Sequence, residues 1–466
     1  MMSLSKKALA LAVTAATLGG GAMLAQAQVA VAPGGLGQAM VYPYMTANSG
    51  WQTFLHVINT SATTVAAKVR FRAAKDSVDV YDFIVVLSPY DVWTGVVEQG
   101  AGGLYGFRPT DNTCTVPYFG KDKFTPFIVQ TSEVYAEVIM MGVSTATSTG
   151  TVGANAKHNT SGVPANCSAV ESAFSNSASV TALTEFSTSL NVFSGTAATN
   201  FLTGKFDLVN VGQGWSGASR ATVIANFGAP AVAGTGTGPY FANTNMWSQQ
   251  APDFDHPTLA EGFSGLTPLN TILTKTNLIN EWVLNPNLGE LSSWVVTFPT
   301  KKLTVDAITA INALSTQTPK LQTFGDATGT NAGCVTVTPA LWNREEKQLV
   351  LASPGTTPLC YEANVLSFKS GAIDSKSVLN SNVAPASGSI PTDLLSTGVI
   401  AGWMNLGMPN NSVLHPFAPA WTTLPGWTAA PITGATAPVG RPVVGFNITA
   451  RTTPSDTVLY DHAYLP

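Results

Sequence analysis

Apolar and polar positions alternate along short segments of this chain from residue 36 to about residue 145. Successive side chains of a strand point to opposite faces, so this alternation predicts β-strands rather than helices. Ser, Thr, Ala and Lys-Asp-Ser turns separate the segments, which lie at 53–59, 66–73, 80–88 and 127–143. Together they predict an N-terminal domain of antiparallel strands.

The strand pattern returns after an interruption. From Ser144 to about Asn200 the chain is rich in Ser, Thr, Ala and Asn, and we expect a long surface excursion there with one short helix. A second β region opens at 204–228. Further strands are expected at 291–302, 334–343, 359–368, 397–406 and 441–453, with a short helix at 305–314.

One segment of the second half has helical rather than alternating spacing. Thr267 and Pro268 suit an N-cap and a first helical turn, and Asn285-Pro286 ends the pattern. The apolar residues that recur at helical spacing are Leu269, Ile272, Leu273, Ile279 and Val283. The sequence therefore predicts a helix at 267–284.

These elements predict a mainly β protein with two β-sandwich-like domains, long Ser/Thr-rich loops and one or two short helices. The N-terminal β-sandwich-like domain would span residues 28–200 and include the Ser/Thr/Ala-rich excursion. The C-terminal β-rich domain would span residues 201–466 and contain the helix near 267–284.

Residues 1–27 have the features of a signal peptide. Lys6 and Lys7 precede an apolar run, and Ala25 and Ala27 supply the small residues that signal peptidase needs. We therefore expect cleavage near Ala27 and an extracellular or cell-surface location.

The composition indicates an ordered chain with little charge and no surface for nucleic acid. Charged residues are only 10% of the chain, against about 25% in ordinary soluble domains. The hydrophobic fraction of 45% excludes a disordered chain, and Ser, Thr, Asn and Gly then leave a surface of hydroxyl and amide groups. A net charge of −4 with scattered basic residues provides no patch for nucleic acid.

Four cysteines, an even number in an exported chain, predict two disulfides with three open pairings. Sequence neighbours give the simplest choice, Cys114 with Cys167 and Cys334 with Cys360. A zinc site is disfavoured because no C-x₂-C spacing exists and no histidine lies near the cysteines.

The most charged stretch is VAAKVRFRAAKDSVDVYDFIVVLSPYDVW, residues 65–93. It could be a binding or catalytic cluster, or the polar face of a structural hairpin. Alternation places Lys68, Arg70 and Arg72 on one face of a strand, and an antiparallel return would bring aspartates opposite them. We favour a half-buried hairpin without chemistry.

Two other motifs do not indicate a site. Gly212, Gly214 and Gly217 form a G-x-G-x-x-G, but a strand rather than a helix follows, so we expect a turn between strands and no dinucleotide. The five histidines stand singly, without metal-ligand or nucleophile spacing, at positions His56, His158, His256, His415 and His462.

One acidic loop is a candidate metal site. Asp253, Asp255 and Glu261 lie in a Pro-bounded segment at 251–262, where carboxylate oxygens could hold calcium. A solvated acidic loop explains the same residues and is the preferred interpretation. We expect no other cofactor.

Several phrases resemble a family. GWQTFLHVINTSATTVAAKVRFRAAKDSVDVYDFIVVLSPYDVW, SSWVVTFPTKK and CYEANVLSF together are similar to cell-surface proteins of Gram-negative bacteria that are described as surface-layer proteins. The resemblance spans most of the mature chain and carries no catalytic residues. It implies an extracellular array subunit of β-sandwich domains, in which calcium could take part.

We therefore expect a secreted structural protein, not an enzyme, that self-assembles into a cell-surface layer. Its partners would be copies of itself, with the outer-membrane surface or lipopolysaccharide as anchor. The alternative is an extracellular adhesin or glycan-binding module that uses loop aromatics such as Trp421 and Trp427. A secreted hydrolase is a third class.

Overall fold

The computed structural model shows a mainly β protein with several antiparallel sheets and two short α-helices among the residues that it describes. These residues are 30–175, 185–186, 200–227, 269, 272–301, 334–351, 355–370, 373–374, 377–385, 389–391, 398–409 and 440–465. The predicted signal peptide and the predicted helix at 305–314 lie outside them.

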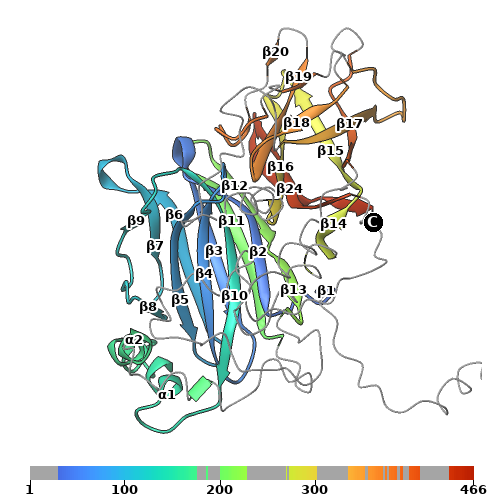
Figure 1. The fold of residues 1–466 in the computed structure, drawn as a ribbon. Coiled ribbons are helices and arrows are strands. Elements are labelled where there is room, and N and C mark those ends of the chain that lie inside the picture. Colours follow the sequence, from blue (N-terminus) through green and yellow to red (C-terminus); the bar gives the residue numbers. More distant parts are fainter. Residues whose placement is uncertain are drawn as a thin grey trace, which may run out of the picture.

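Two sheets form a sandwich in the N-terminal half (Figure 1). Sheet A has the order β1 (Ala30–Val31), β13 (Thr222–Ala225), β2 (Ala39–Thr46), β10 (Glu133–Ser144), β4 (Thr64–Ala73), β5 (Asp79–Leu87) and β8 (Cys114–Val116). Sheet B has the order β12 (Trp215–Arg220), β11 (Leu202–Asn210), β3 (Trp51–Asn59), β6 (Val92–Gln99), β7 (Tyr105–Pro109) and β9 (Thr125–Pro126). Two short 3₁₀ turns, Asn48–Gly50 and Ala101–Gly103, lie at strand ends.

Sheet B is apolar on one face only. Every second residue of β3 is buried, from Trp51 through Leu55 and Val57. Sheet A is different, because all residues of β2, β4 and β10 are buried on both faces. Helices α1 (Val152–Ala156) and α2 (Cys167–Ser175) cover one end of its outer face, at the lower left of Figure 1.

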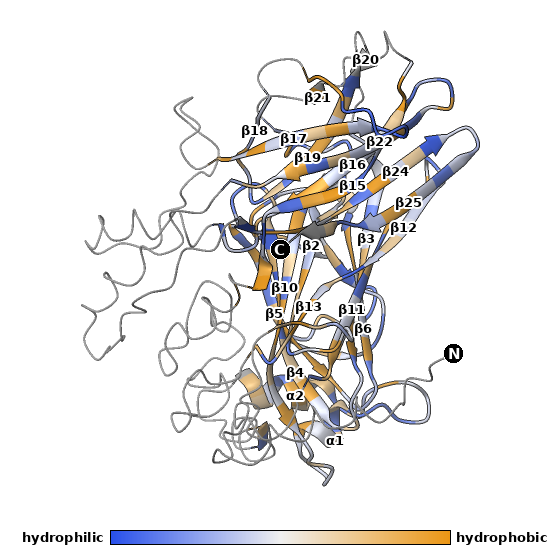
Figure 2. Cartoon of the chain, turned by 90° about the vertical axis from the view of Figure 1, so that its right-hand side faces the viewer, coloured by the Kyte–Doolittle hydropathy of each residue, from blue (hydrophilic) through white to orange (hydrophobic). Residues whose placement is uncertain are grey.

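The C-terminal half is a second sandwich with two layers. Its outer layer contains β18 (Thr357–Leu359), β17 (Val335–Asn343), β22 (Ala401–Gly407), β15 (Asn277–Asn285) and β26 (Ala463–Leu465). The other, which we call the middle layer, contains β19 (Ala363–Ser370), β16 (Glu290–Thr297), β24 (Val444–Thr452) and β25 (Ser455–Asp461), with β20 (Ile373–Asp374) and β21 (Ile390–Pro391) beside β19. The short strands β14 (Thr274–Lys275) and β23 (Arg441–Pro442) pair with each other. Figure 2 shows hydrophobic stretches along β15, β17 and β19.

The middle layer is buried on both faces. Trp294 and Val296 of β16 point into the core of the C-terminal sandwich, whereas Val295 belongs to the core of the N-terminal sandwich. Phe446 of β24 meets Phe206 of sheet B with ring centroids 5.3 Å apart. The core of the N-terminal sandwich therefore continues onto one face of the middle layer, while the C-terminal sandwich has a second core on the other face.

Polar contacts follow the same junction. Thr297 Oγ1 donates to the Pro43 carbonyl at 2.6 Å, and Trp51 Nε1 donates to the Val378 carbonyl at 3.3 Å. The carboxylate of Glu133 accepts from the Asn382 amide at 2.9 Å. Buried polar groups thus find their partners across the junction.

The predicted strands are confirmed in both halves, but the helix predicted at 267–284 is wrong. Among the described residues of that segment, only 269, 272 and 273 are helical, and β15 occupies 277–285. β15 pairs with β22, β26 and β16. Its backbone groups form hydrogen bonds with these strands instead of the hydrogen bonds within the segment that a helix would need. Leu278 and Trp282 are four residues apart, a spacing that suits a helix, yet both are buried from the strand.

The boundary predicted at residue 200 differs from the structure. β11 pairs along its length with β3, and β13 pairs with β2, so residues 202–225 complete the N-terminal sandwich. Single-sequence patterns do not show such pairing, because the partner strands are far apart in the chain.

Phe446→Ala tests the shared core. Phe446 is fully buried, so its loss should lower the free energy of unfolding by about 3–5 kcal/mol. Chemical denaturation of this variant should still show the two halves unfolding in one transition. The control Tyr460→Ala, at an exposed residue of the neighbouring strand β25, should hardly change the free energy of unfolding. Two separate transitions in the parent protein would show that the halves are independent.

Candidate functional site

The charged residues of the 65–93 stretch lie on the outer face of sheet A. β4 and β5 form the predicted antiparallel hairpin, with Arg70 opposite Asp82 and Arg72 opposite Asp79. The predicted pairing of charges is confirmed. The predicted half-burial is wrong for the basic face, because Lys68, Arg70 and Arg72 are only 1–2% exposed.

Ion pairs connect these side chains into a group that we call the ion layer, made of Lys68, Arg70, Arg72, Asp79, Asp82 and Glu137. Lys68 Nζ lies 3.1 Å from Asp82 Oδ1, and Arg70 Nε lies 2.9 Å from Asp79 Oδ2. Arg72 Nε lies 3.1 Å from Glu137 Oε1 of β10. The ion layer therefore links three neighbouring strands, β5, β4 and β10.

Burial is the largest influence on the pKa values of Lys68 and Asp79 in the ion layer. It lowers the pKa of the Lys68 ammonium, although Asp82 opposes the change. It raises the pKa of Asp79, although Arg70 and Arg72 oppose the rise. Such pairs add little net stability, but each member becomes costly to the fold once its partner is removed. The ion layer is thus best explained as a structural feature and not as a binding or catalytic cluster.

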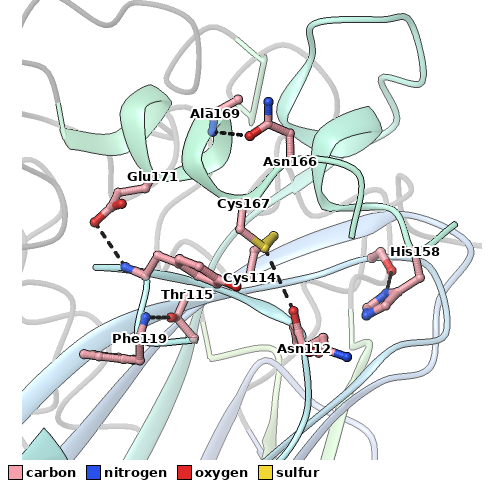
Figure 3. Close-up of a disulfide and its surroundings, with 12 residues drawn as sticks. Asn112, Cys114, Thr115, Phe119, His158, Asn166, Cys167, Ala169 and Glu171 are labelled. Carbon is pink, nitrogen blue, oxygen red and sulfur yellow. Dashed lines mark hydrogen bonds between the residues drawn. A yellow bond between two sulfur atoms is a disulfide. The ribbon is translucent and has the colours of Figure 1, made fainter. Parts of the chain in front are cut away.

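Both disulfides are confirmed with the pairing of sequence neighbours. Cys114–Cys167 joins the edge strand β8 to α2, and Cys334–Cys360 closes the β17–β18 hairpin. Figure 3 shows the first bridge, with Asn166 Oδ1 accepting from the Ala169 amide at the start of α2. Two disulfides are typical of proteins that fold in an oxidising compartment.

The metal prediction is not addressed by the structure. Asp253, Asp255 and Glu261 lie outside the described residues. Within those residues, no group of three or more His, Cys, Asp or Glu side chains is placed to hold a metal ion.

The glycine motif is a hairpin turn, as predicted. β11 and β12 are antiparallel partners on either side of residues 211–214, and Gly214 has a φ of +68° that favours glycine. A Cβ at Gly217 would come within 2.1 Å of Leu459 of β25, so this glycine also permits close packing between the halves.

His56 has two polar neighbours on adjacent strands of sheet B, which sequence reasoning missed. Its Nε2 lies 2.8 Å from Asp207 Oδ2 and its Nδ1 lies 3.1 Å from Thr94 Oγ1. A hydroxyl, an imidazole and a carboxylate in a row are the residue types of a hydrolase triad. However, the Thr94 amide already donates to Asp111 and so is not free to stabilise an oxyanion beside that hydroxyl. A cross-strand polar ladder on the exposed face of sheet B explains the arrangement.

His462 is buried between the layers of the C-terminal half. Its Nε2 donates to the Val295 carbonyl at 3.0 Å, and its Nδ1 faces Asn280 Nδ2 at 3.1 Å. This pattern suits the neutral imidazole, and burial lowers the pKa of His462 to about 4. His256 and His415 lie outside the described residues.

Two further features could bind a ligand. Trp342 of β17 and Trp403 of β22 are cross-strand neighbours whose rings stack with centroids 4.0 Å apart, and both are half-buried. The described residues also line an open cavity of about 270 Å³ between the two halves, with Arg220, Lys275 and Asp461 among the lining residues. The strand pattern could have predicted the Trp pair only if the register between β17 and β22 were known. The cavity could not be predicted from local patterns, because it forms only when the two halves dock.

No protein-family model, curated protein or solved structure matches the chain. Within the residues that the structure describes, no helix has the length and apolar character needed to cross a membrane.

Glu137→Gln tests the ion layer. Removing one charge leaves Arg72 buried without that carboxylate, so the free energy of unfolding should fall by about 3–5 kcal/mol. The exposed pair of Arg451 and Asp456 supplies the control, because Asp456→Asn should cost less than about 1 kcal/mol. Equal losses in the two variants, measured by denaturant titration, would contradict a buried ion layer.

His462→Gln tests the buried imidazole. The unfolded chain takes up a proton at His462 below its ordinary pKa of about 6.5, but the folded protein does so only near pH 4. Stability should therefore fall as the pH drops from about 6.5 to 4, with His462 contributing about 3 kcal/mol of that loss. Unfolding titrations across this window should show a shallower dependence for His462→Gln.

Proposed function

We propose that this protein is a secreted structural subunit that self-assembles into a layer on the cell surface. The observation that carries the proposal is the burial of charge in a chain that has little of it. The charged side chains buried among the described residues are Lys68, Arg70, Arg72, Glu98, Glu133, Glu137, Glu185, Lys301 and Glu362. The chain has 22 Lys and Arg and 26 Asp and Glu residues in all, and the burial of these nine takes them away from the surface. Weak electrostatic repulsion between copies favours close association.

The shared core supports the same proposal. An array subunit must hold its contact surfaces in a fixed relation, because small errors accumulate over many copies. The middle layer packs on both sandwiches at once, and the two disulfides tie down α2 and the β17–β18 hairpin. These features give the subunit a single rigid body.

Three of the four end strands of sheets A and B are too short to favour association by strand addition. β1 and β9 have two residues each, and β8 has three. The fourth, β12, has six residues and lies against β25, where Ser219 contacts Asp461. Short edges are a usual protection against open-ended pairing. Contacts between copies would therefore use side chains, in heterologous pairs that do not close.

One exposed apolar group is a suitable contact surface. Ile128 and Val129 follow β9 and are 80% and 43% exposed, and Leu104 is 46% exposed. Gln130 holds the two segments together, since its side chain bonds to both the amide and the carbonyl of Tyr105. We assign this group to a contact between copies.

The test is assembly of the purified protein, followed by light scattering and electron microscopy as concentration rises. The parent protein should form ordered sheets or large oligomers, and Ile128→Asp with Val129→Asp should remove them without changing stability. Val350→Asp is the matched control, because Val350 is 85% exposed and lies outside this apolar group.

Chelation tests the predicted calcium loop, since dispersal of the assemblies by a chelator and their recovery with calcium would place Ca²⁺ in the contact. Monomers under all these conditions would refute the proposal.

A glycan-binding module is the second candidate, and the Trp342–Trp403 pair favours it. Indole rings at a half-exposed site can pack against sugar rings. The buried Oδ1 of Asn405, two residues along β22 from Trp403, has no hydrogen-bond partner among the described residues and could accept a sugar hydroxyl. Trp421 and Trp427, the loop aromatics expected to bind, lie outside the described residues. A stable monomer that is retained on an immobilised glycan, with retention lost in Trp403→Ala, would favour this candidate.

A further inference from the structure

The cavity of about 270 Å³ is built by both halves of the chain and is lined by described residues. On the N-terminal side the residues after β1 dock on β13, where the Ala32 amide donates to the Val223 carbonyl at 2.8 Å. On the C-terminal side the Val443 amide donates to the Leu273 carbonyl at 3.0 Å. Figure 1 shows β14 next to β13 and β1 in this region.

Three polar side chains of the cavity wall have no hydrogen bond or ion pair with any other described residue. They are the Arg220 guanidinium and the hydroxyls of Thr203 and Thr222. The Ala221 amide donates to the Gly204 carbonyl at 3.1 Å, which brings the segments carrying these three side chains together. Arg220 Nη1 lies 4.0 Å from the place that a Cβ on Gly35 would occupy, so the guanidinium lies at the cavity wall. Arg220 is exposed and Thr203 and Thr222 are half-exposed, so solvent reaches all three side chains and a ligand in the cavity could replace that solvent.

The lining has an excess of positive charge. Lys275 is half-buried and its Nζ donates to the Ile272 carbonyl at 3.0 Å. Burial lowers the pKa of Lys275. Asp461 is the carboxylate in the lining, and it accepts a hydrogen bond from Ser219 Oγ. The lining thus holds two cationic side chains and one carboxylate, a balance that favours an anionic ligand.

We propose that this cavity binds a small anionic ligand of monosaccharide size, with its carboxylate or phosphate group on Arg220 and its hydroxyls on Thr203 and Thr222. A guanidinium binds either oxyanion through two parallel hydrogen bonds. Val31, Leu273 and Val443 supply apolar walls for the ring of the ligand, and the volume is at the small end of ligand sites. This inference is independent of self-assembly, because it concerns a site within one copy.

Titration calorimetry on the full-length protein tests the proposal with four probes: glucuronate, glucose 6-phosphate, glucose and inorganic phosphate. Glucuronate or glucose 6-phosphate should bind saturably, and the comparison between them identifies the oxyanion. Arg220→Gln should weaken that binding by ~10- to 100-fold, as expected for loss of a charged hydrogen bond. Thr222→Val keeps the β-branched shape and should weaken it by a smaller factor.

Arg451→Gln is the matched control, because Arg451 lies on β24, outside the cavity lining, and pairs with Asp456. It should leave the affinity unchanged, and circular dichroism should confirm that each variant is folded. The proposal is overturned if neither acidic sugar binds at millimolar concentration, or if neutral glucose binds as tightly as the acidic sugars. It is also overturned if Arg451→Gln and Arg220→Gln weaken binding equally, or if Arg220→Gln and Thr222→Val both leave the affinity unchanged. Should Arg220→Gln fail to fold, Thr222→Val alone decides the outcome. Light scattering on the same samples reports assembly separately.

Discussion

Burial of the middle layer on both faces is the constraint on which the rest of the structure depends. Trp294 and Val295 are neighbours in β16, yet they belong to the cores of different sandwiches. A strand with two buried faces cannot alternate with polar residues, which is why SSWVVTF reads as a nearly continuous buried run. The same docking joins the halves, forms the junction cavity and holds Thr297 and Trp51 against their partners across the junction.

Part of the limited charge of this protein lies in its interior. The ion layer occupies the outer face of sheet A, where Arg70 contacts two aspartates and Arg72 contacts Glu137. Burial of ions is costly unless each is paired, so these contacts specify the register of β4, β5 and β10 more than they stabilise the fold.

The exposed face of sheet B shows how the remaining polar residues are arranged. His56 bridges Asp207 and Thr94 across three strands, and Glu98 receives a bidentate contact from Arg108. Such cross-strand pairs each contribute a few tenths to about 1 kcal/mol. They reinforce one face of the N-terminal sandwich, while the short end strands β1, β8 and β9 discourage strand addition.

The sequence by itself indicated most of the strands and favoured the nearest-neighbour disulfides, because alternation is local and Cys114 lies close in the chain to Cys167, as Cys334 does to Cys360. It also indicated that aspartates would oppose Arg70 and Arg72, since a hairpin fixes that pairing. Only the tertiary structure decided that residues 277–285 form β15. The spacing of Leu278 and Trp282 fits a helix equally well, and strands distant in the chain supply the hydrogen bonds. The burial of Lys68, the return of β11 to β3 and the cavity beside Arg220 likewise depend on long-range docking, which no local pattern encodes.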